Sequence, residues 1–206
     1  MRSILFALVL SLICAAAEAD KPAQTILVFG DSLSAGLGMP RERAWPALLE
    51  ARLAQRHYPY RVVNASISGE TTSGGVTRLP EALAKFKPAI VILELGANDG
   101  LRGLAINEMR SNLDTMIRQS RARRVKVLLI GIRLPPNYGG DYTRKFADSY
   151  AELGRRYKTA LLPFLFEGFA ENRDAFQEDG LHPTAAIQPL MLDNVWRVLS
   201  PLLSKP

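Results

Sequence analysis

The sequence predicts an α/β fold in which helices cover a single parallel sheet. Short apolar runs alternate to the end of the chain with longer segments whose apolar residues recur every three or four positions. The chain has 206 residues, 48% of them hydrophobic and 22% charged, which suits one globular domain with a full core. No internal repeat, low-complexity tract or charge block divides it, so we expect one domain over residues 20–206.

The apolar runs give the expected strands, of which 89–95 is the clearest: 25–29, 61–64, 89–95, 125–130 and 160–164. Helical periodicity gives the expected helices: 45–56, 76–86, 106–121, 142–157 and 184–203. In the first of these, Trp45, Leu49 and Leu53 recur at i, i+4 and i+8 and should be buried. Pro46 falls in the first turn, where proline is tolerated. We expect a polar turn over residues 66–74 and an irregular stretch from 165 to 183.

Residues 1–19 have the pattern of a secretory signal peptide. Arg2 supplies the positive charge, residues 4–17 are apolar, and Ala17-Glu18-Ala19 is a small-x-small cleavage site. The apolar run is too short to cross a membrane, and no later segment is long and apolar enough. We therefore expect a periplasmic or secreted protein. The single cysteine, Cys14, would leave with the signal, so the mature protein would depend on its core without a disulfide.

The net charge of +6 is compatible with a nucleic-acid partner, an anionic membrane surface or a solvated basic surface. The basic residues are scattered, which favours the solvated surface. Their one cluster, residues 118–126, falls at an expected helix end, where cations offset the helix dipole. No nucleic-acid motif accompanies it, so we expect no nucleic-acid partner.

Gly30-Asp31-Ser32-Leu33 follows the first expected strand directly. A serine on a glycine-containing turn after a strand is where a nucleophile lies in α/β hydrolases, although the Gly-x-Ser-x-Gly pattern is absent. A helix cap formed by Asp31 or Ser32 explains the same residues equally well.

Several polar residues share the functional edge of the predicted sheet, because parallel strands all end on one side and ligands bind there. They are Ser32, Gly69, Asn98, Asp179 and His182. The only other histidine, His57, falls on the opposite edge and should be a surface residue. Asp179 precedes His182 by three residues, so across a tight turn its carboxylate can reach Nδ1 and leave Nε2 free for the serine. Asp99 is a rival acid that we interpret as a cap for the helix after it.

An oxyanion would need hydrogen-bond donors at this same edge. The candidates are the N–H of Ser32, the N–H of Gly69 and the side-chain amide of Asn98. Singly, Gly69 is also explained as a turn glycine, and Asn98 as a local side-chain turn.

Together these positions resemble the SGNH (GDSL) hydrolases, whose four blocks carry a serine, a glycine, an asparagine and a histidine. Here the blocks are Gly-Asp-Ser-Leu at Ser32, Ser-Ile-Ser-Gly-Glu-Thr at Gly69, Gly-Ala-Asn-Asp at Asn98, and Asp-Gly-Leu-His-Pro at His182. The chain is most similar to the bacterial periplasmic thioesterase/arylesterase/lysophospholipase group. Residues 98–103 and 134–139 support this, while Ala97 replaces a frequent glycine.

The resemblance implies a flavodoxin-like three-layer α/β/α fold with a five-stranded parallel sheet in the order 2-1-3-4-5. It also implies ester and thioester hydrolysis without a metal or organic cofactor, and a loop at 100–105, hinged at glycines 100 and 103, that moves over acyl chains.

We thus expect Ser32 to attack an acyl ester or thioester, His182 to take its proton, and Asp179 to hold His182. Several residues are plausible walls of an acyl pocket, although each could equally belong to the core: Leu101, Leu104, Ile132, Pro135 and Tyr138. The alternatives are a carbohydrate O-acetylesterase and a non-catalytic lipid carrier on the same fold. Substrates should be small acyl compounds, lysophospholipids among them, and the protein should be a monomer.

Overall fold

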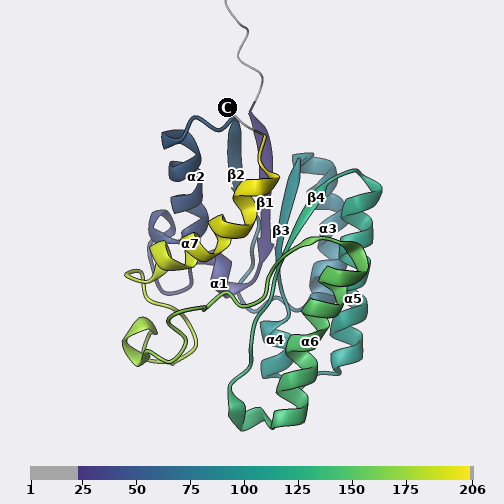
Figure 1. Ribbon diagram of the computed structural model, residues 1–206, viewed down its shortest axis with the longest axis vertical. Coiled ribbons are helices and arrows are strands. Elements are labelled where there is room, and N and C mark those ends of the chain that lie inside the picture. Colours follow the sequence, from purple (N-terminus) through teal and green to yellow (C-terminus); the bar gives the residue numbers. More distant parts are fainter. Residues whose placement is uncertain (1–22, 205–206) are drawn as a thin grey trace, which may run out of the picture.

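A parallel five-stranded sheet forms the centre of the protein in the computed structural model, which describes residues 23–204 (Figure 1). Its strands are β1 (Gln24–Gly30), β2 (Tyr60–Asn64), β3 (Ile90–Glu94), β4 (Lys126–Ile130) and β5 (Ala160–Leu162). All four neighbouring pairs are parallel and the order is β2-β1-β3-β4-β5, which confirms the predicted topology. The expected signal peptide lies outside the described residues.

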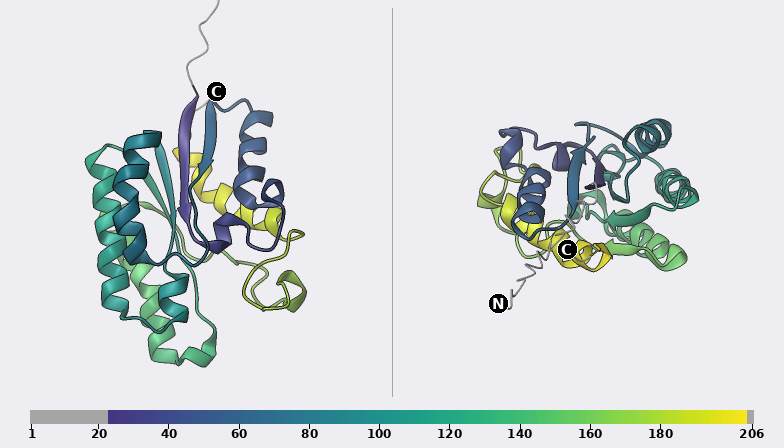
Figure 2. Two further views of the ribbon diagram at one scale, coloured as in Figure 1. Left: turned by 180° about the vertical axis from the view of Figure 1, so that it is seen from behind. Right: turned by 90° about the horizontal axis from the view of Figure 1, so that it is seen from above.

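Helices cover both faces of the sheet, which gives three layers (Figure 2). The helices α2 (Trp45–Gln55) and α7 (Gln188–Leu199) pack together on one face, and α3 (Thr72–Phe86), α5 (Ile106–Ala122) and α6 (Gly140–Tyr157) lie on the other. Two short helices, α1 (Ser32–Ala35) and α4 (Ala97–Leu101), directly follow β1 and β3. None of the helices within residues 23–204 combines the length and the apolar character that crossing a bilayer requires.

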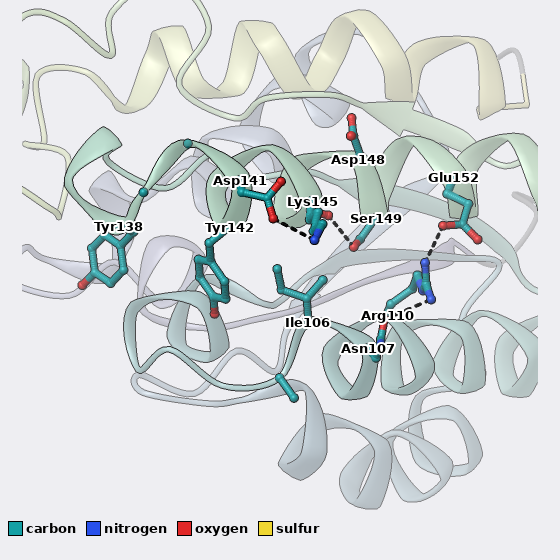
Figure 3. Close-up of a pocket in the computed structure, with 13 residues that line it drawn as sticks. Ile106, Asn107, Arg110, Tyr138, Asp141, Tyr142, Lys145, Asp148, Ser149 and Glu152 are labelled. Carbon is teal, nitrogen blue, oxygen red and sulfur yellow. Dashed lines mark hydrogen bonds and ion pairs between the residues drawn. The ribbon is translucent and has the colours of Figure 1, made fainter.

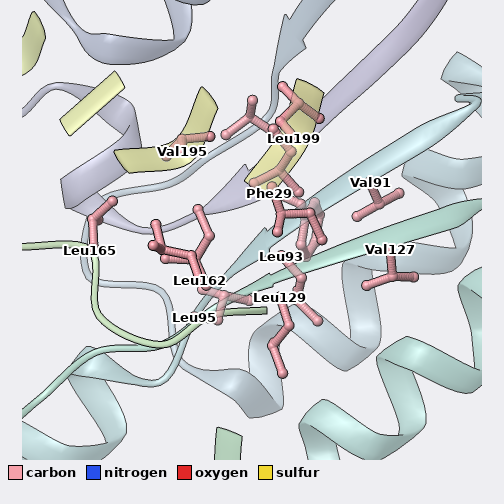
Figure 4. Close-up of a cluster of buried hydrophobic side chains, with 14 of the residues drawn as sticks. Phe29, Val91, Leu93, Leu95, Val127, Leu129, Leu162, Leu165, Val195 and Leu199 are labelled. Atoms are coloured by element: carbon pink, nitrogen blue, oxygen red, sulfur yellow. The ribbon is translucent and has the colours of Figure 1, made fainter. Parts of the chain in front are cut away.

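The core is apolar on both sides of the central strands. Every residue of β3 is buried, and so is every residue of β1 after Gln24. Strands covered on both faces have continuous apolar sequences, which is why their positions could be predicted from the sequence. Figure 4 shows Phe29, Leu93 and Leu129 of the sheet beside Val195 and Leu199 of α7.

Helix α3 begins at Thr72, four residues before the expected start, so the polar turn is shorter than the predicted 66–74. Two contacts build this extra turn. The Thr71 hydroxyl accepts a hydrogen bond from the Gly74 N–H at 3.5 Å. The Asp99 carboxylate accepts from the N–H of Thr72 at 2.9 Å and from its hydroxyl at 2.6 Å. The second contact joins residues 27 apart, which local periodicity does not record.

The last strand and the last helix are both shorter than expected, at positions set by proline. Strand β5 ends at Leu162 because Pro163 has no N–H to continue the ladder. Helix α7 begins at Gln188 rather than at residue 184, since Pro189 has no N–H to donate and is tolerated only in a first turn. It ends at Leu199 and passes into the 3₁₀ turn Ser200–Leu202, which contains Pro201.

Candidate active site

Ser32 is the first residue of α1 and is separated from the end of β1 by Asp31 alone. Asp31 is the N-cap of this one-turn helix, and its carboxylate accepts a hydrogen bond from the Leu33 N–H at 3.0 Å. The helix ends at Gly36, whose φ of 77° is in the left-handed region that glycine adopts easily. The two explanations of this tetrapeptide therefore hold together: Asp31 caps a helix, and the cap places Ser32 at the carboxyl edge of the sheet.

Ser32, His182 and Asp179 form a continuous hydrogen-bonded chain. Nε2 of His182 lies 2.9 Å from Oγ of Ser32, and Nδ1 of His182 lies 2.6 Å from Oδ2 of Asp179. A carboxylate on Nδ1 fixes the tautomer that leaves Nε2 free to accept the serine proton. The geometry that the sequence predicted for these residues is present, and it can activate a nucleophile. His57, in contrast, is exposed at the end of α2.

The other oxygen of Asp179 shapes the loop that carries the histidine. Oδ1 accepts hydrogen bonds from the N–H groups of Leu181 at 2.8 Å and His182 at 3.0 Å. Partial desolvation opposes ionisation, but these N–H groups and the imidazole outweigh it and lower the pKa of Asp179 to about 2. Asp179 is therefore an anion throughout the neutral range, as support of an imidazolium requires.

Two residues that the sequence reasoning missed hold the same loop. The Arg173 guanidinium donates to the carbonyl oxygens of Gln177 and Glu178, each at 2.7 Å. The Gln177 side chain donates to the carbonyl oxygens of Leu37 at 2.8 Å and Pro183 at 3.2 Å, which ties the histidine loop to the segment after α1. These bonds run to backbone oxygens, which carry no sequence signal.

Asn98 lies near the start of α4 and lines the same cavity as Ser32. Its Nδ2 donates one hydrogen bond to Oδ2 of Asp31 at 3.1 Å. Because an amide nitrogen carries two hydrogens, the second remains to be donated to an oxyanion. The N–H of Ser32 belongs to the first turn of α1, where no intrahelical acceptor is available.

Gly69 has a φ of 79°, in the left-handed region. A Cβ there would meet only the Arg102 guanidinium, at 3.8 Å, so backbone conformation and not close approach accounts for the glycine. Arg102 also donates to the carbonyl oxygen of Gly69 at 3.0 Å. The preceding turn is fixed to β1, because Gly30 donates to the Ser66 hydroxyl at 3.1 Å and accepts from the Ile67 N–H at 3.0 Å.

Asp31 is buried, and burial raises its pKa to about 6. The hydrogen bonds from the Leu33 N–H and the Asn98 amide, and the nearby His182, act in the opposite direction, while Asp99 adds to the rise. At neutral pH Asp31 is thus an anion near the imidazole, with its two oxygens occupied by Leu33 and Asn98.

Asp99 has a different role from the one expected. It lies inside α4, and its carboxylate binds the N-terminus of α3 at Thr72 rather than capping the helix that follows it. The interpretation as a cap for the following helix is therefore wrong, because the bonding partner is the preceding helix. Its two carboxylate oxygens are both used there, which leaves Asp179 as the acid on His182.

A cavity of about 650 Å³ opens beside Ser32 and His182. Its walls are mostly apolar, and among them are three aromatic side chains that the sequence reasoning did not single out: Phe164, Phe166 and Phe176. Phe166 packs edge-on against Phe176 with ring centroids 5.5 Å apart. An apolar group attached to a carbonyl carbon at Ser32 has room here.

Of the residues expected to form pocket walls, Leu101, Ile132 and Pro135 line this cavity and Leu104 and Tyr138 do not. The Leu104 side chain is 42% exposed. The Tyr138 hydroxyl instead donates to the carbonyl oxygen of Leu101 at 3.1 Å. Leu104 follows the end of α4 at Leu101, in an exposed segment, whereas Tyr138 belongs to the separate 3₁₀ turn Pro136–Tyr138.

The two glycines expected to act as hinges differ. Gly100 lies within α4, and a Cβ there would come within 2.6 Å of Leu134 and 2.7 Å of Phe146. Gly103 has a φ of 65° and open space around it. Packing thus explains Gly100, and only Gly103 has the conformation of a free turn.

A larger hollow, of about 860 Å³, lies between α5 and α6 (Figure 3), and Ser32 is not among the residues that line it. Its rim carries the ion pairs Arg110–Glu152 and Lys145–Asp141, at 2.8 Å and 2.7 Å. It contains none of the three residues of the hydrogen-bonded chain, so its size does not mark it as the reaction site.

Comparisons with known proteins find similar sequences and structures. Residues 28–188 match the GDSL-like Lipase/Acylhydrolase family. The chain is 50% identical to esterase TesA of Pseudomonas aeruginosa, over 98% of this chain and 100% of that protein. It is 40% identical to thioesterase 1/protease 1/lysophospholipase L1 of Escherichia coli K12, over 88% and 86%. The crystal structure of the psychrotrophic esterase EstA from Pseudoalteromonas, inhibited by monoethylphosphonate, superposes with a TM-score of 0.83 at 36% identity and covers 86% of this chain and 97% of that one.

Proposed function

Because the chain belongs to the GDSL-like lipase/acylhydrolase family, we propose that it hydrolyses carboxylic esters and thioesters through an acyl-enzyme on Ser32. The observation that carries the proposal is the continuous chain from Ser32 Oγ through the imidazole of His182 to Asp179, at 2.9 and 2.6 Å. A lipid carrier would have no use for this arrangement.

The reaction would proceed in two steps, acylation of Ser32 and hydrolysis of the acyl-enzyme. Ser32 Oγ bonds to the carbonyl carbon while its proton passes to Nε2 of His182, and the charge moves to the carbonyl oxygen. The N–H groups of Ser32 and Gly69 and the Asn98 amide would hold that oxyanion. Collapse breaks the bond to the alcohol or thiol, which leaves with the proton from His182. Water then attacks the acyl-enzyme in the same way, which releases the acid and restores Ser32.

The cavity supports a proposal for the chemical class of the substrate. Its aromatic and aliphatic walls favour esters of apolar acyl or aryl groups over the short acetyl group of an O-acetylated sugar. Relatives named esterase, arylesterase, and thioesterase and lysophospholipase support the same class. The reaction as derived uses side chains and backbone donors of this chain alone, with no metal or organic cofactor in any step.

The predicted signal peptide would place this activity in the periplasm or outside the cell. The pattern of residues 1–19 supports this proposal. Mass spectrometry of the protein secreted or released from the periplasm should give a mature N-terminus at Asp20. An intact Met1 on protein retained in the cytoplasm would contradict it.

A substrate panel with a matched variant tests the proposed function. Wild type and Ser32→Ala would be compared on acetyl and longer p-nitrophenyl esters, an acyl-CoA and a lysophospholipid. We expect turnover by the wild type, a preference for acyl groups longer than acetyl, and loss of activity on every substrate in the variant. Turnover by Ser32→Ala near the wild-type rate would overturn the acyl-enzyme, and a strict preference for acetylated sugars would overturn the substrate class.

A further inference from the structure

Glu94 is a buried acid directly behind the nucleophile, in a strand that is otherwise apolar. It is the last residue of β3, its exposed fraction is zero, and it stands in register with Gly30 of β1. Its Oε2 accepts a hydrogen bond from the Ser34 hydroxyl at 2.7 Å and lies 3.5 Å from the Asp31 N–H. Its Oε1 has no hydrogen-bond partner among the described residues. The reaction derived above makes no use of this side chain.

The surroundings of Glu94 favour its neutral form. An ionised carboxylate with one unpaired oxygen in a buried site is very unfavourable. Burial, followed by the adjacent Asp31 carboxylate, raises the pKa of Glu94 well above its usual value. The Tyr150 hydroxyl of α6 interacts electrostatically with this carboxyl group. It donates to the carbonyl oxygen of Leu95 at 3.0 Å and provides no positive charge. Burial and the neighbouring Asp31 carboxylate therefore both favour the protonated form of Glu94.

Glu94 also explains the glycine of the Gly-Asp-Ser-Leu motif. A Cβ on Gly30 would lie 2.6 Å from Oε2 of Glu94, 2.8 Å from its carbonyl oxygen and 2.9 Å from Oγ of Ser34. Contacts below 3.0 Å with backbone and with a buried, hydrogen-bonded group leave no room for adjustment. The φ of Gly30 is not in the left-handed region, so space, and not conformation, requires the glycine.

These contacts involve both the segment that carries Ser32 and the oxyanion donor Asn98. Glu94 binds the N-cap of α1 through the Asp31 N–H and the helix itself through the Ser34 hydroxyl. Asp31, held in this way, accepts from the Asn98 amide that would serve the oxyanion. Hydrogen bonds thus connect one buried acid to the start of α1 directly and to the Asn98 amide through Asp31.

We propose that Glu94 is a positioning residue for the hydrolysis, which fixes residues 30–34 and, through Asp31, the amide of Asn98. The inference rests on the function proposed above. Glu94 touches no reacting atom, so its loss should lower kcat and leave KM nearly unchanged.

Three variants test it. Glu94→Gln keeps the size, the neutrality and an acceptor, so kcat should stay within about threefold of wild type. Glu94→Leu fills the site without an acceptor and should lower kcat by about 10- to 100-fold, since small displacements of reacting groups have effects of that size. Ser34→Ala removes only the 2.7 Å contact and should lower kcat about fivefold, with a small fall in melting temperature because a buried acceptor loses its donor. It carries the test if Glu94→Leu does not fold.

Ser120→Ala is the matched control, because Ser120 is a buried serine of α5 that bonds only the carbonyl oxygen of Met116. Its kcat should equal that of wild type. Wild-type kcat in both Glu94→Leu and Ser34→Ala would overturn the inference. A Glu94→Gln rate as low as that of Glu94→Leu would also overturn it, since a charge would then be needed. Retained activity in Ser32→Ala would instead refute the proposed function, so the two failures are distinguishable.

Discussion

Nε2 of His182 lies 2.9 Å from Oγ of Ser32, although 150 residues separate them in the chain. The parallel sheet accounts for this contact. Ser32 follows β1, and the loop that carries His182 follows β5, so both lie at the carboxyl edge. The proposal that Ser32 is a nucleophile depends on this contact. The groups around the contact can be tested one at a time.

Asp179→Asn should lower kcat on a p-nitrophenyl ester by about 10²- to 10⁴-fold with little change in KM, because an amide can stabilise the wrong imidazole tautomer. Asn still accepts hydrogen bonds from the Leu181 and His182 N–H groups, so the loop should keep its shape. Steady-state kinetics with a circular dichroism spectrum of each protein make the comparison. Equal kcat values would show that the 2.6 Å contact has no part in the reaction.

Asn98→Ala should lower kcat by about 10²- to 10³-fold, the usual effect of removing one oxyanion donor. The matched control is Asn107→Ala, since Asn107 is an exposed amide of α5 whose side chain accepts a hydrogen bond from Arg110 and lies outside the cavity beside Ser32. Kinetics of both variants on the same ester provide the measurement. A loss of equal size in both would remove Asn98 from the proposed oxyanion site.

Asp31→Asn should raise the free energy of unfolding and lower kcat. The sign of the stability change follows from the pKa of Asp31. Burial raises this pKa from 3.8 to about 6, so between these values the native state holds a proton that the unfolded state has lost. Wild-type stability therefore falls as the pH rises from 4 to 6 and stays lower above it, by about 3 kcal/mol from this group.

The Asn variant has no such titration, so its advantage over wild type in unfolding free energy should be larger at pH 8 than at pH 4. Its kcat should fall at the same time, because an amide at residue 31 can turn a donor towards Nδ2 of Asn98. Urea unfolding at the two pH values measures the first effect. An advantage that does not change with pH would contradict the buried, ionised Asp31.

Leu101→Phe and Leu104→Phe are a matched pair that tests the cavity. Leu101 lines it and Leu104 is exposed outside it, three residues further along. The added volume at residue 101 should lower kcat/KM for an octanoyl ester more than for an acetyl ester, by about tenfold. The change at residue 104 should leave the ratio of the two rates unaltered. An equal response to both substitutions would mean that the acyl group binds elsewhere.

Much of the fold and the chain of Ser32, His182 and Asp179 was predictable because the signals are local. Buried strands read as apolar runs, and a polar motif after each strand must lie at one edge. The start of α3 and the role of Asp99 were predicted wrongly because both depend on a long-range contact. Asp99 binds Thr72, which lengthens α3 and changes the role of Asp99 itself.

Glu94 is an example of a residue whose importance was visible in the sequence but was not predicted from its pattern. A single acid at the end of the apolar run 90–93 signals a buried ionisable group, yet its partners on β1 and α1 appear only in three dimensions. Leu104 could not be separated from Leu101 by sequence, since both are leucines beside the same motif and only the end of α4 at Leu101 distinguishes them.

Covalent labelling of Ser32 tests the central claim most directly. The wild type would be treated with a p-nitrophenyl phosphonate ester, digested and mapped by mass spectrometry, with His182→Ala treated in parallel. We predict one phosphonyl adduct, on the peptide that contains Ser32, formed in proportion to the loss of esterase activity and far more slowly in His182→Ala. An inactivated enzyme with an unmodified Ser32, or a full adduct on Ser32 with undiminished turnover, would contradict the account.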